Sequence, residues 1–212
     1  MRGRLLALLA APQPAQFDAP PALPLTVSTP DLRLHLAGGQ HAQRDGCHLI
    51  CDAGTVIPVE EVLAAYLSRP DDWRPDLPGP YSLVLLDPGR RRCLLARDHG
   101  GQRALYYRAA AGQMTVASRL PDLLRAAGGR LPLHVPALLD SLVTGYPVPP
   151  ETLYQGLRQV RAGHLLRWDA GAYSETPLPL PSAPEAPLRA LIEQALPTAG
   201  QSAAVLLSGG LD

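Results

Sequence analysis

The sequence predicts an α+β chain, in which a strand-rich domain precedes a shorter segment with one helix and one strand. Short apolar runs separated by turn residues follow one another closely between residues 81 and 117. Only a few segments show the apolar spacing of a helix. A Pro-rich stretch over residues 177–187 is typical of a linker. We therefore expect one domain over residues 1–176 and a second unit over residues 188–212.

Near the amino terminus the expected elements are short strands. Residues 5–9 form an apolar run that predicts a buried strand. The two arginines before this run are also typical of a secretory signal, but no clean cleavage site follows, and we favour the strand. Residues 32–36 alternate apolar and polar side chains, which predicts a half-buried strand. Residues 48–51 predict another strand, ended by the turn residues Asp52-Ala53-Gly54.

Four helices are expected from the apolar spacing. The first covers residues 59–67, because Pro58 suits a helix start and acidic residues fill the first turn. Its predicted buried face consists of Val59, Val62, Leu63 and Tyr66. The other helices are expected over residues 120–126, 135–143 and 188–196. In the helix over residues 135–143, we expect Leu138, Leu139 and Leu142 to face inward.

The remaining strands are expected to be mostly paired by tight turns. Residues 81–86 and 93–96 flank the turn Asp87-Pro88-Gly89, so they predict a hairpin. A second pair is expected over residues 105–107 and 115–117. Two single strands are expected over residues 164–168 and 203–207.

The composition excludes several function classes. All 19 basic residues are Arg, because the sequence contains no Lys, and it also contains no Asn. Without Lys there is no Schiff-base lysine and no phosphate-binding P-loop lysine. Without Asn there is no N-glycosylation acceptor and no Asn amide for an oxyanion hole. The 19 basic residues equal the 19 acidic ones, and no apolar run is long enough to span a bilayer. We therefore expect neither a nucleic-acid nor a membrane partner.

Three cysteines, Cys47, Cys51 and Cys93, do not form a disulfide framework. His48 lies between the first two, but no second pair of ligands follows, and a tetrahedral zinc site needs four ligands. We expect reduced thiols in the core, no metal, and a cytoplasmic location.

The carboxyl end carries the clearest motif. An apolar run over residues 203–207 leads into Ser208-Gly209-Gly210-Leu211-Asp212. Successive glycines let backbone N–H groups turn toward an anion, and a Ser hydroxyl can add a donor. In open α/β sheets, ligands bind beyond the carboxyl end of a strand. The pattern therefore suits a phosphate site, with a plain turn as the alternative.

This motif is the start of a longer resemblance. The segment Val205–Asp212 resembles the pyrophosphate-binding loop that opens the synthetase domain of the asparagine synthetase family. Several upstream segments resemble the same family, in the family's order: Arg97–Tyr107, Val116-Ala117-Ser118, Gly145–Gly156 and Ala162-Gly163-His164.

The resemblance implies that the first domain is a class II glutamine amidotransferase domain, with the αββα sandwich of the N-terminal-nucleophile hydrolases. It implies that the second unit begins an α/β ATP-pyrophosphatase domain, in which ATP with Mg²⁺ activates a carboxylate as an acyl-adenylate. The residues expected to contact ATP are Leu206, Leu207, Ser208, Gly209, Gly210 and Asp212. Because the sequence stops at Asp212, we expect only the truncated start of that domain and an incomplete ATP site.

The sequence departs from the family at three positions that glutamine hydrolysis needs. In active members a Cys follows the initiator Met, and its thiolate attacks the amide carbon while its α-amino group acts as the base. Here Arg2 stands at that position. Asp52-Ala53-Gly54 replaces the family's Asn-Gly-Glu substrate turn, and Pro78 replaces the Asp that holds the substrate ammonium group. We therefore predict no catalytic residue and no glutaminase activity.

β-Lactam synthetases and lasso-peptide cyclases resemble asparagine synthetase and also lack the N-terminal Cys. There an internal amine, instead of ammonia, attacks the activated carboxylate. By this resemblance we expect the chain to be the amino-terminal part of an ATP-dependent amide ligase. Two alternatives stay open. One is a non-catalytic module that binds a separately encoded synthetase domain or forms a homodimer, and the other is a hydrolase with another nucleophile.

Three further groups are expected to be structural. Arg90-Arg91-Arg92 is expected on a solvated hairpin turn. Asp98 and His99 are adjacent and suit acid–base chemistry, but in the family the Arg-Asp pair is structural, and we expect Asp98 buried beside a strand. Tyr106-Tyr107 is expected in the core, and His164 in a loop with a backbone partner.

Overall fold

The computed structural model describes residues 25–29, 32–36, 39–54, 56–110, 112–169, 171–180 and 187–195. The chain divides into two compact units, residues 1–179 and 180–212. The described helix of the second unit is α5 (Leu188–Ala195), which lies within the range 188–196 expected for a helix. Every other described helix and strand belongs to the first unit.

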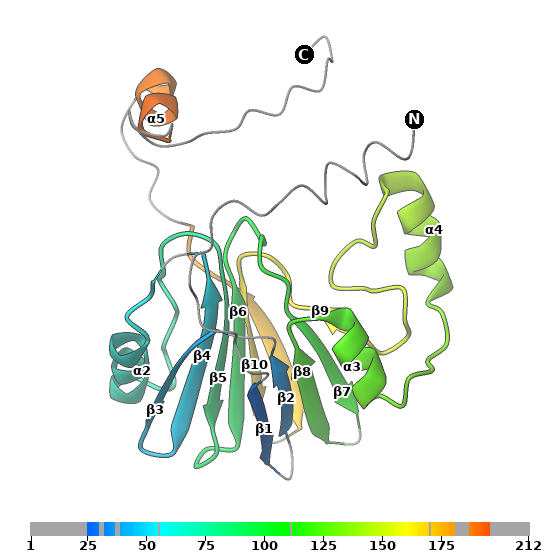
Figure 1. The fold of residues 1–212 in the computed structure, drawn as a ribbon, viewed down its shortest axis with the longest axis horizontal. Helices are drawn as coiled ribbons and strands as arrows, with labels where there is room; N and C mark the ends of the chain where they lie inside the picture. Colours follow the sequence, from blue (N-terminus) through cyan, green and yellow to red (C-terminus); the bar gives the residue numbers. More distant parts are fainter. Residues whose placement is uncertain are drawn as a thin grey trace, which may run out of the picture. The chain divides into compact units, whose positions relative to one another are not determined.

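The first unit contains two sheets (Figure 1). The six-stranded sheet has the order β11-β10-β6-β5-β4-β3, and all its neighbouring strands are antiparallel. Its strands are β3 (Gln40–Arg44), β4 (Cys47–Ala53), β5 (Tyr81–Asp87), β6 (Arg92–Arg97), β10 (His164–Asp169) and β11 (Ala172–Pro177).

The five-stranded sheet has the order β1-β2-β8-β7-β9. Its strands are β1 (Leu25–Thr29), β2 (Leu32–Leu36), β7 (Tyr106–Ala110), β8 (Gln113–Ala117) and β9 (Arg158–Gln159). Among its described pairs, β2 and β8 run in parallel and the others are antiparallel. The expected pairing of the segments around residues 105–107 and 115–117 is confirmed.

The two sheets pack face to face, and side-chain alternation in β5 shows how. Val84 and Leu86 belong to the core between the sheets, together with Tyr107 and Val116 of the five-stranded sheet. Tyr81, Leu83 and Leu85 of β5 point to the opposite face, which α2 (Val59–Ser68) covers. Because both faces of β5 are covered, its residues 83–86 are all apolar instead of alternating with polar ones.

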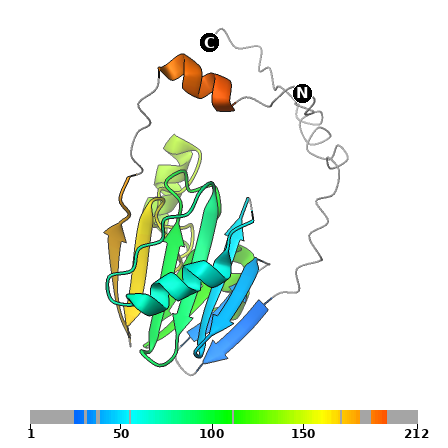
Figure 2. The same cartoon turned by 90° about the vertical axis from the view of Figure 1, so that its left-hand side faces the viewer.

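The outer layers are helices. Figure 2 shows α2, in cyan, lying across the six-stranded sheet. Its buried residues are the four that the sequence predicts, Val59, Val62, Leu63 and Tyr66. On the other sheet α3 (Leu120–Ala126) buries Leu123 against Ala117 and Leu157. The layers are therefore helix, sheet, sheet, helix, built on mainly antiparallel sheets.

Helix α4 (Val135–Thr144) differs from the expectation. The helix forms where the sequence predicts it and ends at Gly145, whose φ of +84° suits glycine. Its leucines, however, do not all face inward: Leu139 is 58% exposed and Leu142 is 76% exposed, and Ala137 is its buried residue. The expected inward packing is wrong for Leu139 and Leu142, because no described helix or strand covers this apolar stripe, whereas Leu138 is half-buried. In Figure 1, α4 lies apart from the sheets.

Other expected elements are confirmed with small changes in length. The segments around residues 32–36, 48–51, 81–86, 93–96 and 164–168 are strands, and the two segments on either side of Asp87-Pro88-Gly89 form the expected hairpin. Strands β1, β3, β9 and β11 were not expected. Strand β11 reaches Pro177, and Leu178 is 5% exposed, so ordered backbone extends into the expected linker. The strands expected over residues 5–9 and 203–207 lie outside the described residues.

Candidate functional site

The expected ATP contacts, Leu206, Leu207, Ser208, Gly209, Gly210 and Asp212, lie outside the described residues, and so does Arg2. The structure therefore tests neither group. It does describe the two segments in which the sequence departs from the family's substrate site, Asp52–Gly54 and Pro78–Pro80.

These two segments lie side by side, where β4 ends and β5 begins. The Gly54 N–H donates a hydrogen bond to the Pro80 carbonyl oxygen at 3.0 Å. A Cβ atom at Gly54 would lie 3.0 Å from Pro80 Cγ, so this close approach favours glycine. The fold thus joins segments that are more than twenty residues apart into one candidate site, as the resemblance led us to expect.

Asp52 is the carboxylate at this strand end, and it already has a cationic partner. Its Oδ1 lies 3.7 Å from Nη1 of Arg103, and each side chain is 40% exposed. A half-exposed ion pair of this kind contributes little to stability, so its side chains can exchange partners at low cost. On the neighbouring segment Pro78 offers no charge to a substrate ammonium group.

A buried arginine holds the loop that carries Arg103. Arg97 is 4% exposed, and its guanidinium donates hydrogen bonds to the carbonyl oxygens of Gly101, Arg103 and Val160. Gly101 has a φ of +59°, and a Cβ there would lie 2.8 Å from Ala162 Cβ. Only glycine fits this position, and the guanidinium keeps the loop against β6.

Asp98 completes this buried group and is structural, as the sequence predicts. It is 7% exposed, and its Oδ1 accepts the Tyr81 N–H at 3.1 Å. Its backbone carbonyl accepts N–H groups from Gly101 and Gly163. His99 Nε2 lies 3.4 Å from the Leu178 carbonyl oxygen, and no hydrogen bond among the described residues joins it to Asp98. The alternative acid–base pair is therefore not assembled.

The three cysteines are buried and free of disulfides. Burial, aided by the nearby Asp87, raises the pKa of Cys47 to about 11. Burial raises the pKa of Cys51 to about 12, and it also raises the pKa of Cys93. All three are neutral thiols at neutral pH and lack the thiolate that nucleophilic attack needs.

The Cys47-His48-Cys51 pattern does not converge on one point. Cys47 and Cys51 lie in the core beneath α2. His48 points to the opposite face, where its ring stacks on His41 of the neighbouring strand. Burial and the nearby His41 lower the pKa of His48. Within the described part of the chain, no three His, Cys, Asp or Glu residues are grouped as metal ligands.

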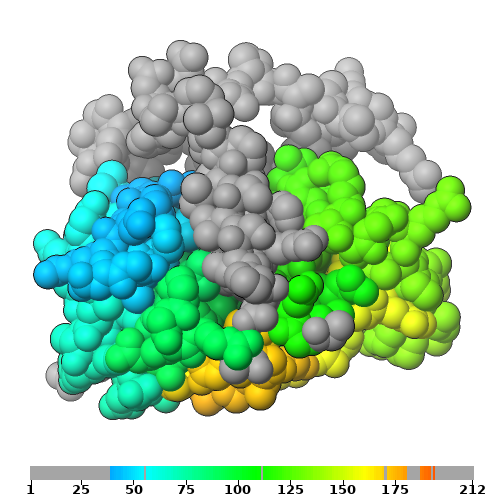
Figure 3. Space-filling view, turned by 90° about the horizontal axis from the view of Figure 1, so that it is seen from below, coloured from blue at the N-terminus to red at the C-terminus, as the bar shows by residue number. Residues whose placement is uncertain are grey.

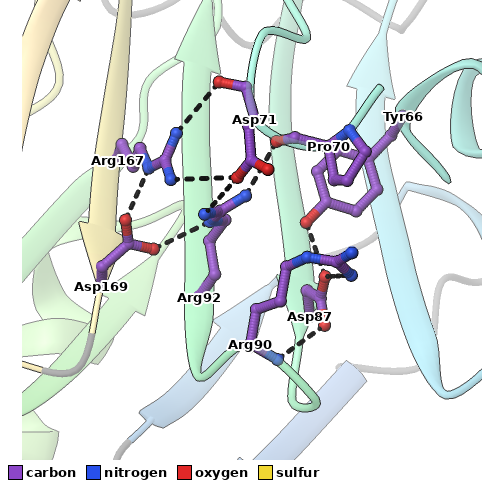
Figure 4. A network of polar contacts seen from close by, with 8 residues as sticks. All are labelled: Tyr66, Pro70, Asp71, Asp87, Arg90, Arg92, Arg167 and Asp169. Carbon is purple, nitrogen blue, oxygen red and sulfur yellow. Dashed lines mark hydrogen bonds and ion pairs between the residues drawn. The ribbon is translucent and has the colours of Figure 1, made fainter. Parts of the chain in front are cut away.

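The basic run at the β5–β6 turn contains a buried residue, which corrects the expectation of a solvated turn (Figure 4). The side chain of Arg92 is 7% exposed and donates hydrogen bonds to Asp169 Oδ1, Asp71 Oδ1 and the Pro70 carbonyl oxygen at 2.8 to 2.9 Å. These partners lie 21 to 77 residues away along the chain. A charge run in the sequence cannot reveal them.

Arg90, at the same turn, forms a second polar group with Asp87 (Figure 4). Asp87 is 2% exposed and accepts hydrogen bonds from the Tyr66 hydroxyl at 2.7 Å and from Arg90. Burial alone would raise the pKa of Asp87, but these hydrogen bonds outweigh it and hold the pKa below its usual value. Burial and the same bond to Asp87 raise the pKa of Tyr66. The group anchors α2 to the hairpin and shows no feature of a reaction site.

The described part of the first unit also contains cavities. One, of about 180 Å³, lies beside the Arg92 group and is lined by Asp71, Arg74 and Arg167 among others. Another, of about 360 Å³, is mostly apolar and lies between β7 and the segment after α4, with Tyr106, Tyr146 and Leu153 in its wall. Part of the wall of the second cavity, including Tyr146, follows directly after α4 in the sequence.

Sequence reasoning missed Arg92 and Arg103 as partners of distant carboxylates. Arg103 lies inside a segment that resembles the family, so this resemblance could have indicated its position near the site. For Arg92 there was none, because its partners come from other strands and from a loop. No described helix combines the length and apolar character needed to cross a membrane.

Comparison with known proteins identifies a related family. A family model for the glutamine amidotransferase domain matches residues 55–178. The matched range begins just after Gly54 and includes Pro78, Arg97 and Arg103, so it covers most of the candidate site. No curated protein matches the chain.

Proposed function

Since this chain belongs to the family of glutamine amidotransferase domains, we propose that its domain keeps the fold of that family without the glutaminase reaction. We propose further that it serves as the amidotransferase-like part of an ATP-dependent amide ligase of the asparagine synthetase type, with the αββα sandwich of the N-terminal-nucleophile hydrolases. ATP with Mg²⁺ would bind the synthetase part, with Ser208, Gly209 and Gly210 in the phosphate loop.

The burial of the cysteines is the observation that best supports the loss of glutaminase activity. Attack on an amide carbon needs a thiolate or an activated hydroxyl within reach of the substrate. All three cysteines of the chain are buried, and burial raises the pKa of each, which leaves none as a thiolate near pH 7. By resemblance, Arg2 stands at the position of the family's nucleophilic Cys, and Arg offers no nucleophile.

The residues expected to bind the substrate support the same proposal. A glutamine substrate carries an ammonium group that needs a carboxylate partner. By resemblance, Pro78 stands where the family has the Asp that holds this ammonium group, and Pro has no carboxylate. Restoring the nucleophile alone would therefore not restore activity, because the site would still not bind glutamine.

Glutamine hydrolysis is expected to be absent in the natural chain and also in the Arg2→Cys variant. The assay measures ammonia released from glutamine, with an active glutamine amidotransferase as positive control. Mass spectrometry of the variant verifies removal of the initiator Met, and circular dichroism verifies the fold. The double variant Arg2→Cys/Pro78→Asp separates the loss of the nucleophile from the loss of substrate binding. Turnover above the blank in Arg2→Cys alone would contradict the proposal.

The ligase role is tested separately on the reading frame that contains this chain and whatever follows Asp212. We expect a synthetase-like sequence there, and an expressed product that exchanges labelled pyrophosphate into ATP in the presence of its carboxylate substrate. A reading frame without such a sequence contradicts the ligase role and favours the second candidate function.

The second candidate is a non-catalytic module that binds a separately encoded synthetase domain, and the α4 face favours it. Val135, Leu139, Leu142 and Val143 are each more than half exposed and follow helical spacing along one stripe. Figure 3 shows the yellow-green segment that contains α4 at the right-hand edge of the described surface. Exposed apolar patches of this kind mark protein interaction sites.

Co-purification decides this candidate. We expect a synthetase domain encoded by the same genome to be retained by the natural chain and lost with Leu139→Arg/Leu142→Arg. Val56→Arg is the matched control, because Val56 is 91% exposed and lies outside α4. Equal retention by both variants would contradict a role for the α4 face.

A further inference from the structure

The cavity of about 180 Å³ lies on the outer face of the six-stranded sheet, the face that α2 also covers. Its floor begins with a row across three strands, in which Leu94, Arg167 and Ser174 are neighbours in register. Leu165 and Thr176 are paired in the next row on the same face and extend the floor. Residues two apart on a strand share a face, so the sheet itself brings these side chains to one cavity.

The wall of the cavity is the loop after α2, and buried contacts hold this loop in place (Figure 4). The Arg92 side chain, which is 7% exposed, donates hydrogen bonds to the Pro70 carbonyl oxygen at 2.8 Å and to Asp71 Oδ1 at 2.9 Å. Trp73 is 8% exposed, and its ring packs edge-on against a tyrosine ring of α2, with centroids 5.7 Å apart. The cavity therefore has its shape before any ligand binds, which lowers the cost of binding.

The lining offers hydrogen-bond donors that the described residues do not use. Arg74 is exposed, and it has no hydrogen bond or ion pair with a described residue. The hydroxyl groups of Ser174 and Thr176 likewise have no hydrogen-bond partner among the described residues. Guanidinium and hydroxyl groups on one cavity suit a ligand that supplies acceptor oxygens.

The charge around the cavity also favours an anion. The carboxylate of Asp71 is in the lining, but it already accepts a hydrogen bond from Arg92 and lies 3.5 Å from Arg167 Nη2. Arg167 also donates from Nε to Asp169, and its five N–H groups leave donors over for a ligand. In this group three guanidiniums, including that of Arg74, outnumber two carboxylates. An anion restores the balance of charge.

We propose that this cavity binds a small organic carboxylate. Its oxygens bind Arg74, Arg167 and the two hydroxyl groups, and its hydrocarbon part lies against Trp73 and Leu165. An inorganic oxyanion would gain nothing from these apolar side chains. The cavity volume equals about six times the share of one water molecule in the liquid, and butyrate has the same number of non-hydrogen atoms. The proposal depends neither on the loss of glutaminase nor on a synthetase domain.

Nuclear magnetic resonance of the indole N–H groups tests the site in the full chain, which contains two tryptophans. Trp73 lines the cavity, whereas Trp168 lies in the core between the sheets and is an internal control. Titration with butyrate at constant ionic strength is expected to shift the Trp73 signal with millimolar affinity and to leave the Trp168 signal in place. Trp168→Phe assigns the two signals.

Variants of the donors test how the ligand is held. Arg74→Gln is expected to weaken butyrate binding at least about tenfold, because a charge-assisted hydrogen bond is lost. The variant should fold, since Arg74 has no partner among the described residues, and thermal unfolding checks this. Thr176→Val retains the shape without the hydroxyl and should weaken binding by a smaller factor. Arg130→Gln is the matched control, because Arg130 is exposed and lies outside the lining.

Two further ligands identify the chemical class. Butyramide resembles butyrate in size but has no charge, and inorganic phosphate has charge but no hydrocarbon part. Each is expected to bind at least about tenfold more weakly than butyrate. The proposal would be overturned by the absence of a Trp73 shift at tens of millimolar butyrate, or by equal butyrate affinity in Arg74→Gln and the natural chain. Phosphate or butyramide binding as tightly as butyrate would overturn it as well.

Discussion

Replacing Arg97 with Ala is expected to lower the free energy of unfolding by about 3 to 5 kcal/mol. The guanidinium is 4% exposed and satisfies three backbone carbonyl oxygens, those of Gly101, Arg103 and Val160. Alanine leaves these acceptors without a donor and leaves the neighbouring Asp98 without a nearby cation. The loop that carries Arg103 would then lose its attachment to β6.

Urea denaturation measures this effect. Arg97→Lys retains the charge but not the planar fork, so it should recover only part of the loss. Arg130→Ala serves as a control, because Arg130 is exposed and a surface substitution changes stability by about 0.5 kcal/mol or less. A midpoint for Arg97→Ala equal to that of the natural chain would show that the buried guanidinium has no stabilising role.

Replacing Trp168 with Ala is expected to cost about 3 to 5 kcal/mol by a different mechanism. Trp168 is 2% exposed and belongs to the core between the two sheets, next to Cys93 in register. The indole fills space between strands that are fixed in two hydrogen-bonded sheets, so the cavity left by Ala cannot close.

Thermal unfolding is the measurement for Trp168. For a domain of this size, the loss corresponds to a fall in the unfolding temperature of about 6 to 20 °C. Trp168→Phe retains an aromatic ring and should lose less than half as much. If the Ala and Phe variants unfolded at the same temperature as the natural chain, the packing between the sheets would differ from the one described.

The candidate site shows where sequence reasoning succeeded and where it could not. Asp52–Gly54 and Pro78 were predicted to belong to one site by resemblance, and the sheet places Asp52–Gly54 beside the segment that leads from Pro78 into β5. The pairing of Asp52 with Arg103, and the attachment of that loop by Arg97, depend on the folded path of the loop. The stacking of His41 on His48 depends likewise on the β3–β4 register.

The missed strands have a common physical reason. Strand β3 has the sequence Gln-His-Ala-Gln-Arg, and of its side chains only Ala42 is buried. Strand β11 is also an outer strand with mostly polar, exposed side chains. Edge strands gain stability from backbone pairing with one neighbour, so they need no apolar alternation that a sequence can show.

The amino-acid sequence alone determined those elements in which the local pattern of side chains indicates which residues are buried. These are the face of α2 and the hairpin of β5 and β6, because period and turn residues are local properties. The burial of Asp98 was expected from the resemblance to the family instead. Only the tertiary structure decided which elements lie together. It packed the two sheets, buried Arg92 against Asp71 and Asp169, and left the apolar stripe of α4 uncovered by the described helices and strands. Those outcomes depend on distances between residues far apart in the chain, and such distances have no local signature in the sequence.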